Sequence, residues 1–266
     1  MNARSALFDL YGDHLRARDG SAPIAALVRL LAPLDVAAPA VRTAVSRMVR
    51  QGWLEPVRLE AGPGYALTRR GTRRLEDAAE RIYGSARLEW DEHWHVVVVG
   101  RPASRAVRAR LRDGLGYLGY AALDDTTWVA PRPSTELDDL LESAGVRADR
   151  FRAQFEGDGV GLVRRAWDLD GLARSYDRWL GEARELVAAA PDGCDDEHAF
   201  AARSRLVHEW RKFLFRDPGL PRCLLPPDWP GERAGVFFDD QAGRLMPAAS
   251  RFVDAMLSLN TNGARS

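Results

Sequence analysis

The stretch from Val41 to Gln51 carries side chains whose types and spacing suit contact with nucleic acid. On a helix with about 100° per residue, its apolar residues fall on one side. The other side holds hydroxyls and guanidinium groups but no carboxylate: Arg42, Thr43, Ser46, Arg47 and Arg50. A guanidinium can donate two hydrogen bonds to guanine, and hydroxyls bind base edges and phosphates. We therefore expect Thr43, Ser46, Arg47 and Arg50 to face a DNA major groove and Arg42 to lie near phosphate.

The elements around this helix must hold it in the groove, and their patterns predict a winged helix-turn-helix domain over residues 1–86. Two helical segments precede the helix, and a β-hairpin with a turn at 61–64 follows Gly52. The expected bounds are Ser5–Arg18, Pro23–Leu31 and Thr68–Ile82 for the other helices and Leu54–Glu60 and Tyr65–Leu67 for the strands. In such a domain the hairpin lies against the DNA backbone, which assigns Arg58 to the wing. The alternative is a small helical domain with an ordinary basic surface.

Composition limits the classes of protein that can carry this segment. The chain has 266 residues, of which 46% are apolar, enough for two or three packed domains. Its formal net charge is zero, yet residues 37–74 hold eight arginines against two glutamates, so the basic potential is local. Its two cysteines argue against a disulfide framework or a cysteine zinc site. Because no run reaches membrane-spanning length and the N-terminus lacks a signal-peptide core, we expect a soluble cytoplasmic protein without a membrane partner.

Residues 87–160 show a different pattern, in which four strands alternate with two helices. The expected elements are strand His95–Val99, helix Ser104–Leu111, strands Gly119–Leu123 and Thr127–Ala130, helix Ser134–Ser143 and strand Asp149–Phe155. The order βαββαβ is that of the ferredoxin-like unit. Many unrelated functions use this fold, so the order alone assigns none.

Residues 161–266 are predicted to form a helical domain, which completes an α+β protein of three parts. One apolar stripe runs from Leu169 to Val187 and another from Phe200 to Leu214, and a proline-rich connection then leads to a closing helix, Pro247–Leu257. Arg203 projects into the middle of the second stripe. A buried guanidinium must be paired, because an unpaired buried charge is very costly. Its partner is either a carboxylate of a neighbouring helix or an anionic ligand.

Two short motifs resemble metal or cofactor sites without the context that such sites need. An alternating strand would aim His93 and His95 to one face, but no third ligand is indicated, so we expect no metal. The stretch Gly114–Gly119 matches G-x-G-x-x-G, yet it ends a helix and leads to a strand, whereas a dinucleotide site follows a strand and opens a helix. The chain also has no nucleophile elbow and no Walker loop. We expect no catalytic residue and no cofactor.

Three long runs of the chain are unusual in sequence: Ala3–Gly12, Val41–Met48 and Leu206–Pro218. Together they resemble the PaaX family of transcriptional repressors, which control phenylacetate degradation in bacteria. The resemblance covers essentially the whole chain. It implies a homodimer that binds double-stranded operator DNA through its winged helix and releases it when an aryl-CoA thioester, typically phenylacetyl-CoA, binds. It also implies a middle domain related to the CRISPR adaptation nucleases, to which we assign dimerisation, and a helical C-terminal domain for the effector.

The effector implied by this resemblance narrows the search for its contacts. An aryl-CoA ester carries several negative charges and two stackable rings, so its site should combine arginine with aromatic surface. Outside the winged helix, the densest mixture of this kind runs from His208 to Arg216, with Trp229 farther along the chain. The candidate effector contacts are Arg203, His208, Trp210, Arg211, Lys212 and Trp229.

Two other functions stay open beside the ligand-responsive repressor. One is a metal-dependent nuclease-like enzyme built on the ferredoxin-like domain, with the winged helix for targeting. The related nucleases place an acidic metal ligand just after the first strand, where this chain has Val99-Gly100-Arg101-Pro102. An arginine there would repel a divalent cation, which favours a regulator that is not an enzyme. The other is an architectural DNA-binding protein that responds to no effector.

Overall fold

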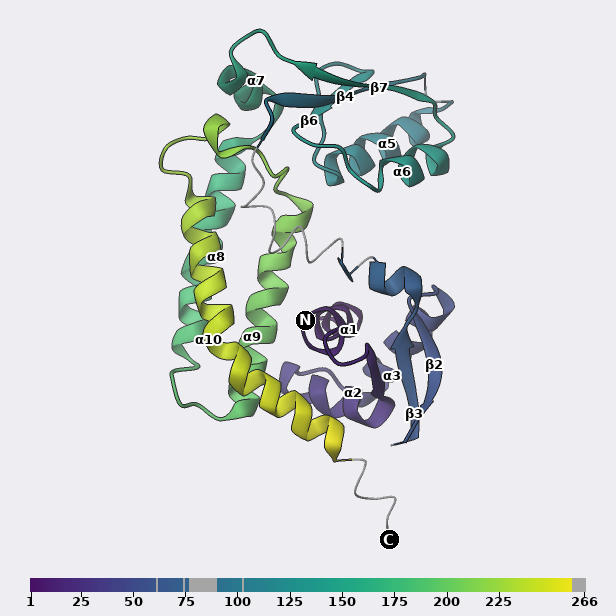
Figure 1. The fold of residues 1–266 in the computed structure, drawn as a ribbon, viewed down its shortest axis with the longest axis vertical. Helices are drawn as coiled ribbons and strands as arrows, with labels where there is room; N and C mark the ends of the chain where they lie inside the picture. Colours follow the sequence, from purple (N-terminus) through teal and green to yellow (C-terminus); the bar gives the residue numbers. More distant parts are fainter. Residues whose placement is uncertain (61, 74, 77–89, 102, 260–266) are drawn as a thin grey trace. The chain divides into compact units, whose positions relative to one another are not determined.

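The structure, a computed structural model, describes residues 1–60, 62–73, 75–76, 90–101 and 103–259 of the chain (Figure 1). It divides into two compact units. The first comprises Met1–Gly84, Arg178–Arg211 and Arg233–Ser266, and the second comprises Ser85–Asp177 and Lys212–Glu232. The helices that the sequence assigns to one C-terminal domain are therefore shared between the two units.

The first unit begins with three helices and a β-hairpin. The helices are α1 (Ala3–Leu10), which continues as a π-helical turn η1 (Tyr11–Leu15), α2 (Ile24–Leu31) and α3 (Ala38–Arg50). The hairpin consists of β2 (Leu54–Leu59) and β3 (Gly62–Leu67), which pair antiparallel. Residues 69–73 and 75–76 are helical, and the rest of the helix expected over Thr68–Ile82 lies outside the described residues.

A short strand that the sequence does not predict, β1 (Ser21–Pro23), pairs antiparallel with β3. Pro23 has an extended backbone with ψ 144°, so α2 begins at Ile24 and not at Pro23. Because β1 runs along β3, there is no room for a side chain at Gly64, where a Cβ would lie 2.8 Å from the carbonyl oxygen of Ala22. The sheet therefore has three strands in the order β1-β3-β2.

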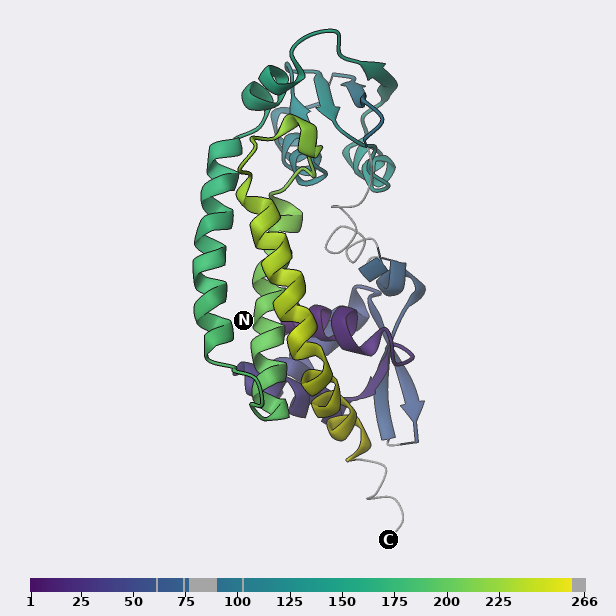
Figure 2. The same cartoon turned by 60° about the vertical axis from the view of Figure 1, so that its left-hand side comes forward.

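The first unit also contains α9 (Asp196–Trp210) and most of α10 (Pro230–Ser258), which lie side by side in Figure 2. Both helices share one hydrophobic core with α1, α2 and α3, and none of these helices packs alone. The core includes Leu7, Leu27, Val45, Met48, Phe200, Phe252 and Val253. The N-terminal helices thus pack against two C-terminal helices in one core. The three separate domains predicted from the sequence do not include this packing.

The closing helix predicted to begin at Pro247 is longer than expected. The structure has α10 begin at Pro230 and keeps Pro247 inside it. A proline within a helix lacks the N–H for the bond to the residue four before it, and its ring crowds that carbonyl, so it bends the helix without ending it when packing holds both halves. Here Ala249, Phe252 and Val253, which follow the proline, are buried in the shared core. Tertiary packing thus outweighs the local tendency of Pro247 to end the helix.

The second unit contains a four-stranded antiparallel sheet with two helices in its connections. Its elements follow in the order β4 (His93–Val99), α5 (Arg105–Tyr117), β5 (Ala121–Ala122), β6 (Thr127–Ala130), α6 (Leu137–Ala144) and β7 (Ala148–Gln154). The strands lie side by side in the order β5-β6-β4-β7. Val97 and Val99 of β4 pack against Leu111, Leu115 and Leu141 of the two helices, which forms the core of this unit.

The chain after this sheet continues through α7 (Gly159–Ala166) and α8 (Leu169–Ala188), which runs from the second unit into the first. The proline-rich connection between α9 and α10 is packed against the protein, since its Leu220, Leu224 and Trp229 are buried. Tyr176 stacks on Phe213 with ring centroids 4.0 Å apart, and its hydroxyl donates to the carboxylate of Asp217. Within the described part of the chain, no helix is both long and apolar enough to span a membrane.

Candidate functional site

The face of α3 that the sequence assigns to DNA is fully open in the structure. Arg42, Thr43, Ser46, Arg47 and Arg50 are all exposed. The opposite face is the one that packs into the core of the first unit, through Val41, Ala44, Val45 and Met48. The hydroxyl of Thr43 donates to the carbonyl of Pro39 at 2.9 Å, one turn back on the same helix. Among the described residues, the arginines of this face have no carboxylate partner, so their guanidinium groups are available to phosphates and base edges.

Arg58 lies on β2 of the hairpin, is exposed and stands opposite Pro63 of β3. At the base of the hairpin, the guanidinium of Arg70 lies over the ring of Trp53 at 4.5 Å, and this ring in turn meets Phe8 of α1 edge-on at 5.7 Å. The hairpin is thereby tied to the first helix through aromatic contacts. The sequence prediction did not single out Arg70, which adds an exposed cation at the base of the hairpin.

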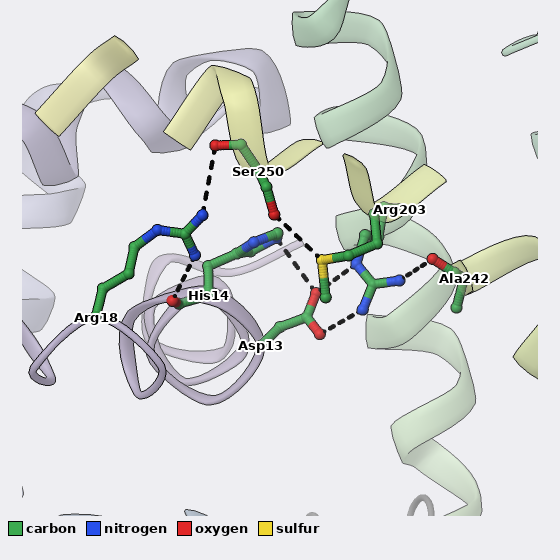
Figure 3. Close-up of polar contacts among 7 residues, drawn as sticks. Asp13, His14, Arg18, Arg203, Ala242 and Ser250 are labelled. Carbon is green, nitrogen blue, oxygen red and sulfur yellow. Dashed lines mark hydrogen bonds and ion pairs between the residues drawn. The ribbon is translucent and has the colours of Figure 1, made fainter. Parts of the chain in front are cut away.

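Behind α3, the N-terminal helix is joined to α9 by a buried ion pair, Asp13 with Arg203 (Figure 3). Arg203 donates from Nε to Oδ2 of Asp13 at 2.9 Å and from Nη2 to Oδ1 at 2.6 Å. Its Nη1 donates to the carbonyl of Ala242 in α10. The two side chains are only 4% and 7% exposed. We call this contact the inner ion pair, and it provides the carboxylate partner that the sequence demands for Arg203.

His14 lies against the inner ion pair, with Nε2 3.2 Å from Oδ2 of Asp13. Its side chain is 1% exposed. Burial lowers the pKa of His14 from 6.5 to about 4, and the nearby Arg203 and Arg18 act in the same direction, while Asp13 opposes them. His14 is therefore neutral at neutral pH. Arg18, one turn further, donates to the carbonyl of His14 at 2.9 Å and to Asp254 of α10 at 2.7 Å.

One turn before Asp13, Asp9 of α1 makes a second contact with α9. Its Oδ2 lies 2.7 Å from Nδ1 of His208, and its Oδ1 is ion-paired with Nη1 of Arg211. The Asp9 side chain is 3% exposed, but His208 and Arg211 are 19% and 20% exposed. Burial lowers the pKa of Arg211, the direction expected for a cation taken out of water. We call this contact the outer ion pair.

Trp210, near the C-terminal end of α9, packs among aromatic rings of α8 and α10. Trp210 stacks on Phe238 of α10 with centroids 4.8 Å apart and 12° between planes, and it meets Trp179 of α8 at the same distance. Trp210 itself stays half-buried. Trp210 thus packs on α8 and α10, whereas His208 and Arg211 on either side of it in the chain contact Asp9 of α1.

The six candidate effector residues do not all belong to one unit. Arg203, His208, Trp210 and Arg211 lie in the first unit, and Lys212 and Trp229 lie in the second. Lys212 is exposed, while Trp229 is buried with its ring edge-on to Tyr176 at 6.1 Å. In the first unit, Arg203, His208 and Arg211 meet carboxylates of the N-terminal helix, and the sequence prediction named neither carboxylate. Asp9 and Asp13, spaced four apart within an apolar helical pattern, were the signal for them.

The histidines considered as metal ligands have other partners. Nδ1 of His95 lies 2.7 Å from the hydroxyl of Tyr120, and Nδ1 of His93 lies 2.7 Å from the carbonyl of Asp91. Burial lowers the pKa of His95. Within the described ranges, no group of three or more histidine, cysteine, aspartate or glutamate side chains is placed to hold a metal ion.

Comparison with known proteins gives matches along most of the chain. Three family models match it: PaaX-like protein at residues 2–71, PaaX protein central Cas2-like domain at 87–161 and PaaX-like protein C-terminal domain at 167–255. The chain is similar to the transcriptional repressor PaaX of Escherichia coli (strain K12), with 30% identity over 268 residues that cover 95% of this chain and 83% of the relative. It is also similar to a solved structure, the uncharacterized protein Rv0674 from Mycobacterium tuberculosis, with 26% identity, a TM-score of 0.59 and coverage of 96% of this chain and 98% of that one.

Proposed function

This chain belongs to the PaaX-like protein family, and we propose that it is a transcriptional repressor that binds operator DNA and releases it when an aryl-CoA thioester binds. The observation that carries the DNA part is the open face of α3, which has three arginines, two hydroxyls and no carboxylate. The family relation supports the repressor part, because the curated relative is a transcriptional repressor.

The elements of residues 1–76 support a winged helix-turn-helix as the DNA-binding module. We propose that α3 enters the major groove with Thr43, Ser46, Arg47 and Arg50 toward the bases and Arg42 near phosphate. The hairpin of β2 and β3 then acts as the wing and places Arg58 on the DNA backbone. This module is fixed to α9 and α10 by the shared core and by the inner and outer ion pairs.

The second unit supports a role in assembly. Its strand order β5-β6-β4-β7, with α5 and α6 in the connections, supports the ferredoxin-like unit that we propose for this domain. We propose that it joins two copies of the chain, since one reading helix covers too few base pairs for a typical specific site and two-fold symmetric partners read paired half-sites. Sedimentation at micromolar concentration, with and without DNA, tests this part. A monomer under both conditions would remove it.

For the effector, we propose an aryl-CoA thioester such as phenylacetyl-CoA, held by the arginine and aromatic side chains at the end of α9. Arg211 supplies a guanidinium fork suited to phosphate, and Trp210 supplies a ring that can pack on an aryl or adenine group. His208, Lys212 and Trp229 stay candidates on the sequence argument. Arg203 is a weaker candidate, since its three donor groups already bond Asp13 and Ala242.

The deciding experiment is a gel shift on the DNA upstream of the protein's own operon, with and without phenylacetyl-CoA. We expect a specific complex that weakens when the thioester is added. Absence of a specific complex would reject the repressor function, and a complex that ignores a panel of acyl-CoA esters would leave an architectural DNA-binding protein. The same DNA incubated with magnesium or manganese is the control for nuclease activity, and specific cleavage lost on chelation would overturn the proposal.

A further inference from the structure

The two ion pairs that join the N-terminal helix to α9 differ in access to solvent. In the inner ion pair both side chains are at most 7% exposed, and each of the three guanidinium nitrogens of Arg203 bonds Asp13 or Ala242. In the outer ion pair, Asp9 is buried but Arg211 is 20% exposed. A ligand can therefore reach the guanidinium of Arg211 without unfolding the helix, and it cannot reach that of Arg203.

The carboxylate of Asp9 occupies the guanidinium that an anionic ligand would need. Guanidinium groups bind carboxylate and phosphate in the same two-pronged geometry. A phosphate that takes Arg211 leaves Asp9 buried in α1, still in contact with His208 but without its arginine. A buried carboxylate that loses its cation is strongly destabilised, so the arrangement of α1 present without the ligand becomes unfavourable.

A change in the position of α1 would affect α3 directly, because the two helices share one core. Asp9 belongs to α1, whose buried side chains share a core with Val41, Val45 and Met48 of α3. These three residues are the back of the face that carries Arg42, Arg47 and Arg50. A shift of α1 therefore changes the support of the reading helix directly.

We propose that Asp9 acts as an internal anion that holds Arg211 when the protein is free, and that a phosphate-bearing ligand releases DNA by taking Arg211 from it. The proposal rests on the proposed function, because it assumes that an anionic effector weakens operator binding. Asp9 is then a positioning residue, since it touches neither the DNA nor the ligand. By reciprocity, the factor by which the ligand weakens operator binding equals the factor by which the operator weakens ligand binding.

The test compares the parent protein with Asp9→Asn, which keeps the shape of the side chain and removes its charge. Operator affinity is measured by fluorescence anisotropy with and without phenylacetyl-CoA, and ligand affinity by calorimetry. For the parent we expect the ligand to weaken operator binding by about 5- to 150-fold, the usual allosteric range. For Asp9→Asn we expect this factor to fall below about twofold and the thioester to bind at least about threefold more tightly, since no carboxylate competes for Arg211.

Two further variants keep the test decisive. Asp35→Asn is the control, because it removes the exposed carboxylate that pairs with Arg205 of α9. In this variant the ligand should weaken operator binding by the same factor as in the parent, which we call the coupling factor. Arg211→Gln leaves Asp9 buried with His208 but without its arginine, so by the same argument it should bind operator more weakly than the parent even without ligand, and it should lose the response to the ligand. Circular dichroism melting shows which variants are folded. If folded Asp9→Asn or, should that variant unfold, folded Arg211→Gln keeps the full coupling factor, the proposal is wrong.

Titrations with three different anions show which part of the ligand supplies the phosphate. They also distinguish failure of this proposal from failure of the proposed function. Phenylacetyl-CoA, coenzyme A alone and inorganic phosphate are each titrated against the parent–operator complex. Release by the thioester and by coenzyme A, but not by inorganic phosphate, would assign Arg211 to a phosphate of the coenzyme. If the parent binds the operator and none of the three anions releases it, both the aryl-CoA effector and the role of Asp9 are rejected, while the DNA-binding function stands.

Discussion

Helices α3 and α9 both carry arginines, but the structure uses them in opposite ways. On α3, Arg47 and Arg50 are exposed and have no carboxylate partner among the described residues. On α9, Arg203 is buried against Asp13, and Arg211 at the C-cap of this helix is largely buried against Asp9. The difference lies in burial and not in residue type. An exposed guanidinium is available to an external anion, whereas a buried guanidinium needs an anionic partner within the protein. Replacing an α3 arginine should therefore change DNA recognition, and replacing an α9 arginine should change stability.

The largest effect is expected at Arg203. Replacing it with leucine leaves Asp13 buried without its cation, which we expect to lower the free energy of unfolding by about 3–5 kcal/mol. Urea unfolding followed by circular dichroism measures this loss. The double variant Asp13→Asn with Arg203→Leu is the control, and it should lose less than Arg203→Leu alone. A loss below about 1 kcal/mol for the single variant would place Arg203 with the exposed arginines.

The second effect concerns pH and His14, which lies beside the inner ion pair. Its pKa is about 4 in the folded protein, against 6.5 for the ordinary side chain. Between these values the unfolded chain binds a proton that the folded protein does not, so stability should fall as the pH drops from 6.5 to 4. The loss should reach roughly 3 kcal/mol, since one pKa unit corresponds to about 1.4 kcal/mol.

Thermal or urea unfolding across this pH range tests the role of His14. His14→Gln cannot take up a proton at this position. Its free energy of unfolding should therefore change much less than that of the parent between pH 6.5 and pH 4, the unfolded and folded pKa values of His14. An equal loss in this variant and in the parent would assign the pH dependence to the carboxylates.

The third effect tests the α3 side of the comparison. Arg50→Ala should remove about 1–3 kcal/mol of discrimination between operator and scrambled DNA, because a direct contact between arginine and guanine is lost. Its free energy of unfolding should stay within about 0.5 kcal/mol of the parent, as for other surface substitutions. Fluorescence anisotropy on both DNAs gives the ratio.

Arg58→Ala on the wing is the matched control for Arg50. It should weaken binding to both DNAs alike and lower the salt slope by about one. An unchanged ratio for Arg50→Ala would show that α3 meets the DNA with a different face.

The fourth effect is smaller and separates the two ion pairs on α9. Arg211→Gln should lower the free energy of unfolding by about 1–2 kcal/mol, since His208 still bonds Asp9 and the position is reached by water. Urea unfolding next to Arg203→Leu gives the comparison. A loss equal to that of Arg203→Leu would mean that the outer ion pair is as well shielded from water as the inner ion pair.

The smallest effect is expected at Arg205, which also lies on α9 but pairs with Asp35 at the surface. The two side chains are 43% and 89% exposed, with 3.1 Å between the charged atoms. Exposed pairs contribute little because water screens them, so Arg205→Ala should cost less than about 1 kcal/mol. A thermal melt at low and at high salt measures both the cost and its screening. A larger cost would mean that position on α9, and not burial, decides the role of its arginines.

The sequence by itself determined most local elements and the exposed arginine-bearing face of α3. Periods of 3.6 and of two residues depend on neighbours along the chain, so they predicted α3, the hairpin and the alternation of strands and helices around β4. The same periodicity showed which side of α3 carries Arg47 and Arg50. It failed at Pro23 and Pro247, where the proline was read as part of a helix start and the actual start, at Ile24 or at Pro230, depended on distant packing.

Only the tertiary structure decided the partners of the buried charges and the division into units. The sequence showed that Arg203 needs an anion, but its partner Asp13 lies 190 residues away, a separation that no local pattern encodes. The runs Ala3–Gly12 and Leu206–Pro218, distinctive as sequence, meet in space through Asp9, His208 and Arg211. Such contacts arise because α9 and α10 bury their apolar faces on the N-terminal helices, and the charged side chains caught in that interface must then be paired.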